Sequence, residues 1–164
     1  MSLPASPDAP TEAVRTVQFL GVPIATYLAL QEWNDALVRE CGQIAALGPG
    51  HSGLPPRLVD LAGLLSERFA EESEAYRDTV AAAQSKGSEV VDLIGTWHQP
   101  TASIEAAEAY LAMMEELDGF CRTDVLLTEA PPLDVIVLRR WFVVEMRDQL
   151  RHGAMPHRFP AGAD

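Results

Sequence analysis

The sequence predicts a mainly α-helical protein, with a four-helix bundle-like fold and a small two-stranded β-ribbon. Four long stretches place apolar residues three and four positions apart, which is the spacing of one helix face. Two shorter stretches alternate apolar and polar residues, which is typical of strands. Glycine and proline stand between these stretches, where helices end and chains turn.

The first twelve residues are expected to form a disordered leader, because three prolines stand among small residues that bury little surface. Residues 13–23 alternate in polarity and end at Gly21 and Pro23, which predicts a first strand. From Ile24 the pattern becomes helical and predicts a first helix that ends near Gly48. Its inward positions are Leu30, Trp33, Leu37, Cys41 and Ile44.

A second helix is predicted to run unbroken from Pro55 to Lys86, after a loop rich in glycine and proline. Gly87 supplies its end. Residues 88–98 contain β-branched side chains and alternate weakly, which predicts a second strand. The two strands are expected to pair and to pack against the helices, since a lone ribbon is only marginally stable.

A third helix is predicted to open at Thr101 or Ser103 and to close near Arg122. The last helix, at residues 131–150, combines an apolar stripe with two adjacent aromatic residues. Gly153 provides its stop. The inward positions of this last helix are Val135, Leu138, Phe142, Met146 and Leu150.

Length and composition favour one domain at residues 13–153, followed by a flexible tail at residues 154–164. The formal net charge of -12 argues against nonspecific nucleic-acid binding, which needs clustered Lys and Arg. No apolar run approaches the roughly 20 residues of a membrane span, and the N-terminus lacks a secretory signal pattern, so a cytoplasmic protein is expected. In that compartment Cys41 and Cys121 are expected to be buried free thiols.

The sequence contains no Walker A loop and no GxSxG, HExxH or CxxC motif. Its acidic groups at residues 71–78 and 115–118 are more simply solvated helix faces than paired catalytic carboxylates, since adjacent helix positions point in different directions. A metal site of His98 with Glu32 or Asp35 is the weaker alternative to ordinary surface residues. No catalytic residue, metal ligand or cofactor is therefore predicted.

The last helix concentrates positive charge, since residues 131–158 carry a net +2 against -14 for the remainder. Its arginines either pair with acids of neighbouring helices or bind a partner, because Arg and aromatic residues are common interface anchors. Trp141 and Phe142 cannot share one narrow stripe, so one of them caps the core edge or is exposed. The candidate partner-binding residues are Trp33, Arg139, Arg140, Trp141 and Arg147.

A family resemblance rests on three segments: VRTVQFLGVPIATYLALQEWNDALVREC at 14–41, SEVVDLIG at 88–95 and FCRTDVLLTEAPPLDVIVLRRWFVVEM at 120–146. Their FLGVP, FCR, LLT, PP and RRWF elements resemble small actinobacterial regulatory proteins and domains that accompany, or are fused to, ATP-binding anti-sigma-factor kinases and anti-sigma antagonists of the partner-switching type. Where that pattern often has Glu-His, this chain has Glu32 and Trp33. The sequence contains no ATP-binding or STAS-type segment, so the resemblance implies that any kinase or phosphate-accepting role belongs to another protein.

Two main hypotheses of function follow. The first is a non-enzymatic regulatory adaptor in a sigma-factor circuit, which binds another signalling protein such as an ATP-binding anti-sigma kinase, or forms a homodimer. The second is a small-molecule sensor that encloses an apolar ligand between helices. Its candidate lining is Trp33, Trp97, Trp141, Tyr27 and Tyr110. An interior cavity with convergent polar groups would favour the sensor, whereas a flat apolar patch or a large two-fold contact would favour the adaptor.

Overall fold

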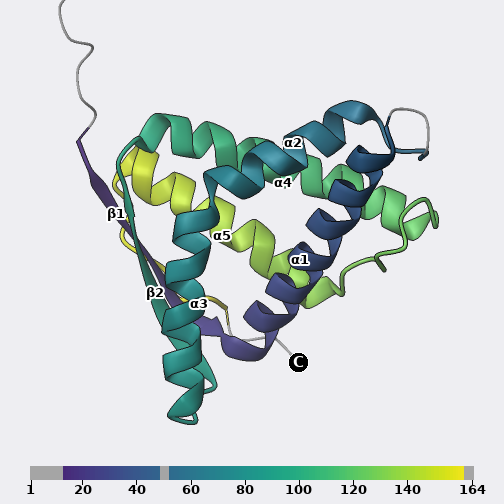
Figure 1. The fold of residues 1–164 in the computed structure, drawn as a ribbon. Helices are drawn as coiled ribbons and strands as arrows, with labels where there is room; N and C mark the ends of the chain where they lie inside the picture. Colours follow the sequence, from purple (N-terminus) through teal and green to yellow (C-terminus); the bar gives the residue numbers. More distant parts are fainter. Residues whose placement is uncertain (1–12, 49–51, 161–164) are drawn as a thin grey trace, which may run out of the picture.

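The computed structural model describes residues 13–48 and 52–160, in which two strands and five helices follow one another (Figure 1). The elements are β1 Arg15–Pro23, α1 Ile24–Leu47, α2 Pro56–Arg68, α3 Ala70–Ser85, β2 Val90–Trp97, α4 Pro100–Arg122 and α5 Leu133–His152. The predicted leader lies outside the described residues. The mainly helical class with a two-stranded sheet is confirmed, and packing as a four-helix bundle stays a prediction.

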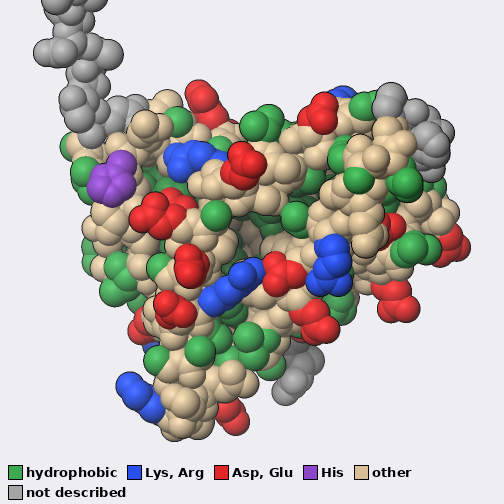
Figure 2. Space-filling view, viewed as in Figure 1, with side chains coloured by type: hydrophobic (Ala, Val, Ile, Leu, Met, Phe, Trp, Pro, Cys, Tyr) green, Lys and Arg blue, Asp and Glu red, His purple; other side chains and the backbone are tan. Residues whose placement is uncertain are grey.

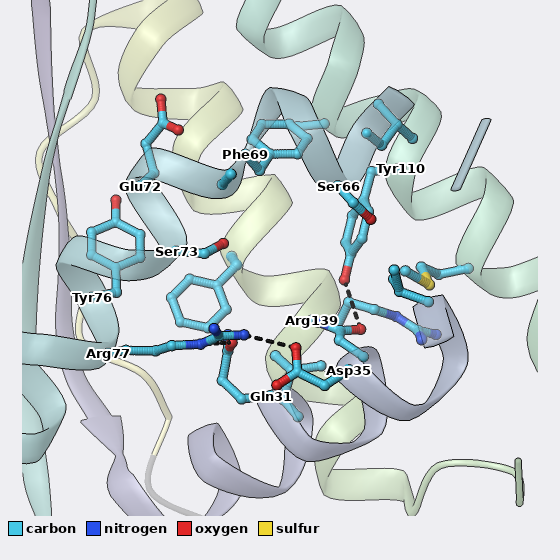
Figure 3. A pocket seen from close by; sticks show the side chains of 18 of the residues that line it. Gln31, Asp35, Ser66, Phe69, Glu72, Ser73, Tyr76, Arg77, Tyr110 and Arg139 are labelled. Atoms are coloured by element: carbon cyan, nitrogen blue, oxygen red, sulfur yellow. Dashed lines mark hydrogen bonds and ion pairs between the residues drawn. The ribbon is translucent and has the colours of Figure 1, made fainter. Parts of the chain in front are cut away.

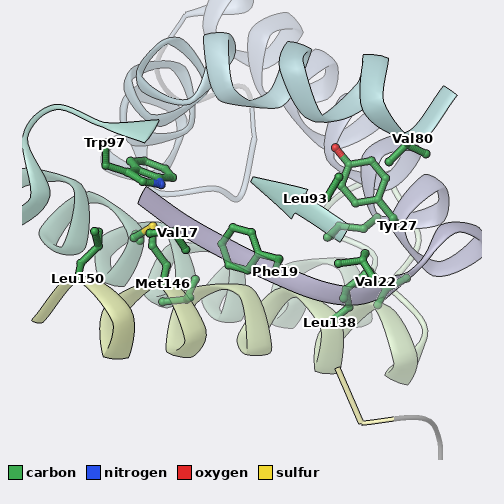
Figure 4. Close-up of a cluster of buried hydrophobic side chains, with 14 of the residues drawn as sticks. Val17, Phe19, Val22, Tyr27, Val80, Leu93, Trp97, Leu138, Met146 and Leu150 are labelled. Carbon is green, nitrogen blue, oxygen red and sulfur yellow. The ribbon is translucent and has the colours of Figure 1, made fainter. Parts of the chain in front are cut away.

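The two strands pair antiparallel, as predicted, with Phe19 opposite Leu93 and Val17 opposite Gly95. These four residues are buried on one face of the ribbon, and α5 contacts β1 while α3 contacts β2. Figure 4 shows Val17 and Phe19 of β1 lying over α5. The opposite face is open, since Ile94 between the buried positions of β2 is 62% exposed. The alternation of apolar and polar residues therefore reflects a ribbon that packs one face on the helices and exposes the other.

The predicted unbroken helix from Pro55 to Lys86 is wrong, because the chain turns at Phe69 and continues as a separate helix. Phe69 has φ -105° and ψ 10°, and its ring packs edge-on against Trp97 and Tyr110 with centroids 6.2 Å away in each case. On one side of the turn α2 contacts α1 and α4, whereas on the other α3 contacts β2. A straight helix could not follow both surfaces, and Figure 1 shows the change of direction.

The last helix is confirmed and ends where the sequence predicts, at Gly153 in a left-handed conformation with φ 62°. The Gly153 N–H donates to the Gln149 carbonyl, so the turn satisfies a helix-end acceptor. Of the predicted inward positions of α5 only Phe142 is half-buried, and the others are buried. The third helix begins at Pro100, slightly before the predicted start, because proline suits a first helical turn.

The predicted flexible tail covers residues 154–164, and its flexibility stays a prediction. Residues 154–160 return along β1, where the Phe159 N–H donates to the Leu20 carbonyl at 2.8 Å. The Phe159 ring also packs edge-on against Trp141, with centroids 5.1 Å apart. One aromatic anchor therefore connects this segment to α5. Residues 161–164 lie outside the described residues.

Buried side chains form two clusters. The first fills the space between the ribbon, α1, α3 and α5, and the second lies between α1, α2 and α4. Cys41 and Cys121 belong to the second cluster as buried free thiols, which confirms the prediction. Phe69 and Tyr110 contact both clusters, so they mark the boundary between them.

No helix in the described part of the chain combines the length and the apolarity that a membrane crossing requires.

Candidate ligand-binding cavity

A cavity of about 1010 Å³ lies between the two core clusters and opens to solvent. All seven elements contribute residues to its lining. Figure 2 shows a hollow in the middle of this face, with acidic and basic side chains beside it. Small-molecule sites typically measure about 300 to 1,000 Å³, so this cavity is at the upper end of that range.

Apolar and aromatic side chains form most of the deep wall. The lining includes Phe19, Phe69, Tyr110, Met113, Met114, Phe142 and Met146. Methionine side chains are flexible and polarizable, so a wall that contains three of them adapts its shape to different ring systems.

An ion pair spans the mouth of the cavity between α3 and α1. Arg77 Nε donates to Gln31 Oε1 at 2.9 Å, and Arg77 Nη2 donates to Asp35 Oδ1 at 2.7 Å (Figure 3). The Arg77 and Asp35 side chains are 49% and 53% exposed. Exposed ion pairs contribute only about 0 to 1 kcal/mol, so this bridge can open to admit a ligand at small energetic cost.

A buried ion pair forms part of the inner wall. Arg139 donates through both terminal guanidinium nitrogens to Asp118, with Nη1 3.2 Å from Oδ1, and the two side chains are 1% and 4% exposed. The Arg139 guanidinium carbon lies 5.4 Å from the centre of the Trp33 ring, which is cation–π geometry. Nearby, the Tyr110 hydroxyl donates to Asn34 Oδ1 at 3.2 Å.

Five buried side-chain polar atoms of the described residues lack a hydrogen-bond partner, and all five belong to residues that line this cavity. They are Tyr27 OH, Glu72 Oε2, Tyr76 OH, Trp97 Nε1 and Arg139 Nε. Buried polar groups are normally paired, and each unpaired one costs about 1 to 3 kcal/mol. Their convergence on one space is the pattern expected where a bound molecule supplies the partners.

The cavity tyrosines remain protonated at neutral pH. Burial raises the pKa of Tyr27 to about 12, an effect that the nearby Arg77 opposes and Asp35 reinforces. Burial also raises the pKa of Tyr76 and of Tyr110 above the ordinary value. The three phenols therefore present O–H groups that can donate or accept hydrogen bonds, rather than negative charge.

Two of the predicted partner-binding residues lie in the interior. Trp33 is 8% exposed and donates its indole N–H to the Glu129 carbonyl at 2.8 Å. Arg139 is 1% exposed and faces the cavity and Asp118. Neither side chain is therefore accessible at the surface, and the Arg139 Nε atom has no hydrogen-bond partner in the interior.

The other three predicted residues lie at or near the surface of α5. Arg140 is exposed and pairs with Glu115 of α4, with Nη2 2.7 Å from Oε1. Arg147 pairs with the adjacent Asp148 at 2.9 Å. Trp141 is half-buried at the core edge, where its ring contacts Phe19 and Phe159 edge-on. Partner binding by these three residues stays a prediction.

Two cavity residues escaped the sequence analysis. Glu72 falls in a stretch interpreted as a solvated acidic face, and Tyr76 is not among the aromatic residues predicted to line a ligand site. They stand four positions apart on α3, which places both on one helix face. A carboxylate and a phenol at this spacing are therefore the one sign in the sequence that the two side chains share a polar site.

Within residues 13–48 and 52–160, no three His, Cys, Asp or Glu side chains are grouped in a way that would hold a metal ion. Comparisons with protein-family models, curated proteins and solved structures found no match to this chain.

Proposed function

We propose that this protein is a small-molecule-binding domain with a sensory role, whose ligand occupies the cavity between α1, α3, α4 and α5. The observation that supports this most is the convergence of five unpartnered polar atoms on one solvent-connected space. Ligand sites combine mostly apolar walls with a few placed polar groups, and this cavity has both. The second hypothesis from the sequence is thus the one that the geometry favours.

The walls favour a ligand with a ring system. Phe19, Phe69 and Phe142 line the cavity and already meet other rings edge-on, with Phe19 and Phe142 centroids 4.7 Å apart. An aromatic ligand would extend these contacts, since ring pairs add about 0.5 to 1.5 kcal/mol beyond the area they bury.

Binding rather than turnover fits the polar groups of the cavity. Its described lining contains neither histidine nor cysteine. The Ser66 hydroxyl donates to the Ala62 carbonyl one turn earlier at 2.7 Å, rather than to a base. Nucleophilic catalysis needs a hydroxyl or thiol held by a general base, and Ser66 is not held in that way.

A blocking variant tests this proposal in the full chain. Ser73 points into the cavity from α3 (Figure 3), so Ser73→Trp should fill it and abolish binding of ring-containing compounds found by a thermal-shift screen. Ser85→Trp on the exposed end of the same helix is the matched control and should bind normally. Equal binding by both variants, with both folded by circular dichroism, would show that the cavity is not the site.

An exposed stripe on α5 favours a second function, the regulatory adaptor. Leu133, Val137 and Val144 are 74%, 42% and 39% exposed and share one helix face with Arg140. Apolar side chains beside an arginine are typical of interfaces, and such a face would let ligand occupancy be reported to a signalling protein.

The adaptor function is testable against the ATP-binding anti-sigma kinases that the family resemblance suggests. Val137→Asp combined with Arg140→Glu should abolish a two-hybrid signal with one of them, while the melting temperature stays nearly unchanged. Leu64→Asp on α2, where the leucine is 64% exposed, is the control and should leave the signal intact. A signal that survives the α5 changes would exclude this face.

A further inference from the structure

We propose that the end of the cavity between α3 and β2 is a subsite for a positively charged nitrogen, so that the ligand is an alkylammonium compound that carries an aromatic ring. This inference rests on the proposed ligand-binding function and specifies the class of ligand. It concerns Glu72, Tyr76 and Trp97, which supply three of the five unpartnered atoms.

Two of these polar groups, the Tyr76 hydroxyl and the Trp97 N–H, lie close together over Gly95. A Cβ built on Gly95 would lie 3.2 Å from Trp97 Nε1 and would overlap the Tyr76 hydroxyl. Both donors therefore lie over the same point of β2, in space that only a glycine leaves free. Figure 3 shows the Tyr76 hydroxyl directed toward Glu72, one helical turn earlier on α3.

The subsite contains a carboxylate without a paired cation. Glu72 forms no ion pair with any of the described residues, and its Oε2 atom is buried without a partner. The nearby cationic side chains are engaged elsewhere, because Arg77 is paired with Asp35 and Arg139 with Asp118. Arg39, the other arginine of the lining, is exposed on α1.

An ammonium group satisfies two of these three groups, Glu72 and Tyr76, and leaves the Trp97 N–H donor without an acceptor. It has three N–H donors and no acceptor, so it can donate to the Glu72 carboxylate and to the Tyr76 hydroxyl oxygen together. A carboxylate in the same place would be repelled by Glu72, and a hydrocarbon would leave all three protein groups unpaired.

Three indole probes with side chains of similar length test the preference by isothermal titration calorimetry of the full chain. Tryptamine ends in an ammonium, tryptophol in a hydroxyl and indoleacetate in a carboxylate. Tryptamine should bind about tenfold more tightly than tryptophol, as expected for a charge-assisted hydrogen bond, and indoleacetate most weakly. Glu72→Gln should remove the advantage of tryptamine and leave tryptophol within about twofold of its original affinity.

Glu71→Gln is the matched control, because the adjacent exposed glutamate changes the net charge equally and does not line the cavity. Equal weakening of tryptamine by the two variants would mean general attraction to an acidic protein and would overturn the subsite. Equal affinity of tryptamine and tryptophol for the unaltered protein, or no binding of tryptamine, would also overturn it. The proposed ligand-binding function is tested separately. It would be refuted if Ser73→Trp and Ser85→Trp bound the same screened compounds equally well.

Discussion

The buried Arg139–Asp118 pair joins α5 to α4, and its removal gives a large and calculable change in stability. Arg139→Met keeps a long apolar stem in place of the arginine. It also leaves the Asp118 carboxylate, which is 4% exposed, without either of the guanidinium nitrogens that now donate to it. Asp118→Leu does the reverse, because it leaves the buried Arg139 guanidinium beside Trp33 without a carboxylate partner.

Each single change should cost about 3 to 5 kcal/mol, which is the usual effect of leaving one member of a buried ion pair alone. The loss of the cation–π contact with Trp33 contributes up to about 2 kcal/mol of the Arg139→Met effect. In the double variant Arg139→Met with Asp118→Leu, no charge remains to be desolvated. That protein should therefore regain most of the stability, and replacement of a buried pair by apolar residues is often neutral or stabilising by about 1 to 4 kcal/mol.

Urea denaturation followed by circular dichroism at pH 7 measures the four free energies of unfolding, and unchanged slopes would show that the same transition is compared. Arg140→Met is the matched control on the same helix, because the Arg140–Glu115 pair is about half exposed and should contribute less than about 1 kcal/mol. Additive losses in the double variant, or an Arg139→Met effect no larger than that of Arg140→Met, would refute the proposed role of the buried pair.

Four further outcomes are expected. Gly95→Ala should cost about 1 to 3 kcal/mol because its Cβ overlaps the Tyr76 hydroxyl, and Tyr76→Phe in the same chain should restore the urea midpoint. Stability should fall between pH 10 and about 12, where the unfolded chain loses the Tyr27 proton and the folded protein keeps it, and Tyr27→Phe should flatten that part of the alkaline profile. Cys121, whose pKa burial raises to about 11, should react with a disulfide reagent far more slowly in the folded protein than in urea, and equal rates would contradict its burial. Phe142→Ala should cost about 3 kcal/mol, and an unaltered denaturation midpoint would refute its place in the core.

Local periodicity predicts the elements that bury one face against one surface. The alternation in β2 puts Leu93, Gly95 and Trp97 on the buried face, as expected from the sequence. The stripe of α5 is similarly reliable, since four of its five predicted inward positions are buried where the helix packs against β1, α1 and α4.

The turn at Phe69 has no comparable signal in the sequence. Neither glycine nor proline stands there, and the apolar spacing of the two helices reads as continuous. The turn exists because α2 and α3 pack on different surfaces. The residues next to Phe69 do not show which surfaces the two helices will pack against. The helix phase also changes at this point. That change brings Glu72, expected on a solvated face, to the cavity.

The candidate site was predictable only in part. Five aromatic residues were expected to line any ligand site between helices. Tyr27, Trp97 and Tyr110 do line the cavity, whereas Trp33 and Trp141 are not part of its lining. Arg139 was assigned to a partner surface, because its sequence neighbours do not show that Asp118, 21 positions earlier, would face it in the interior. Ion pairs between helices depend on how the helices pack, which one helix pattern does not specify.

The energetic cost of the cavity explains why its polar groups point to a ligand. Five unpaired buried atoms at about 1 to 3 kcal/mol each would together equal the net stability of an ordinary domain, about 5 to 15 kcal/mol. Apolar side chains of similar size would avoid this cost, as Phe would at Tyr27 or Tyr76. The groups must therefore find partners in the cavity, from water when it is empty and from a ligand when it is filled. Because Tyr27→Phe removes one unpaired hydroxyl, it should leave the protein equally or more stable near neutral pH while weakening ligand binding, and this opposite response separates a binding group from a structural one.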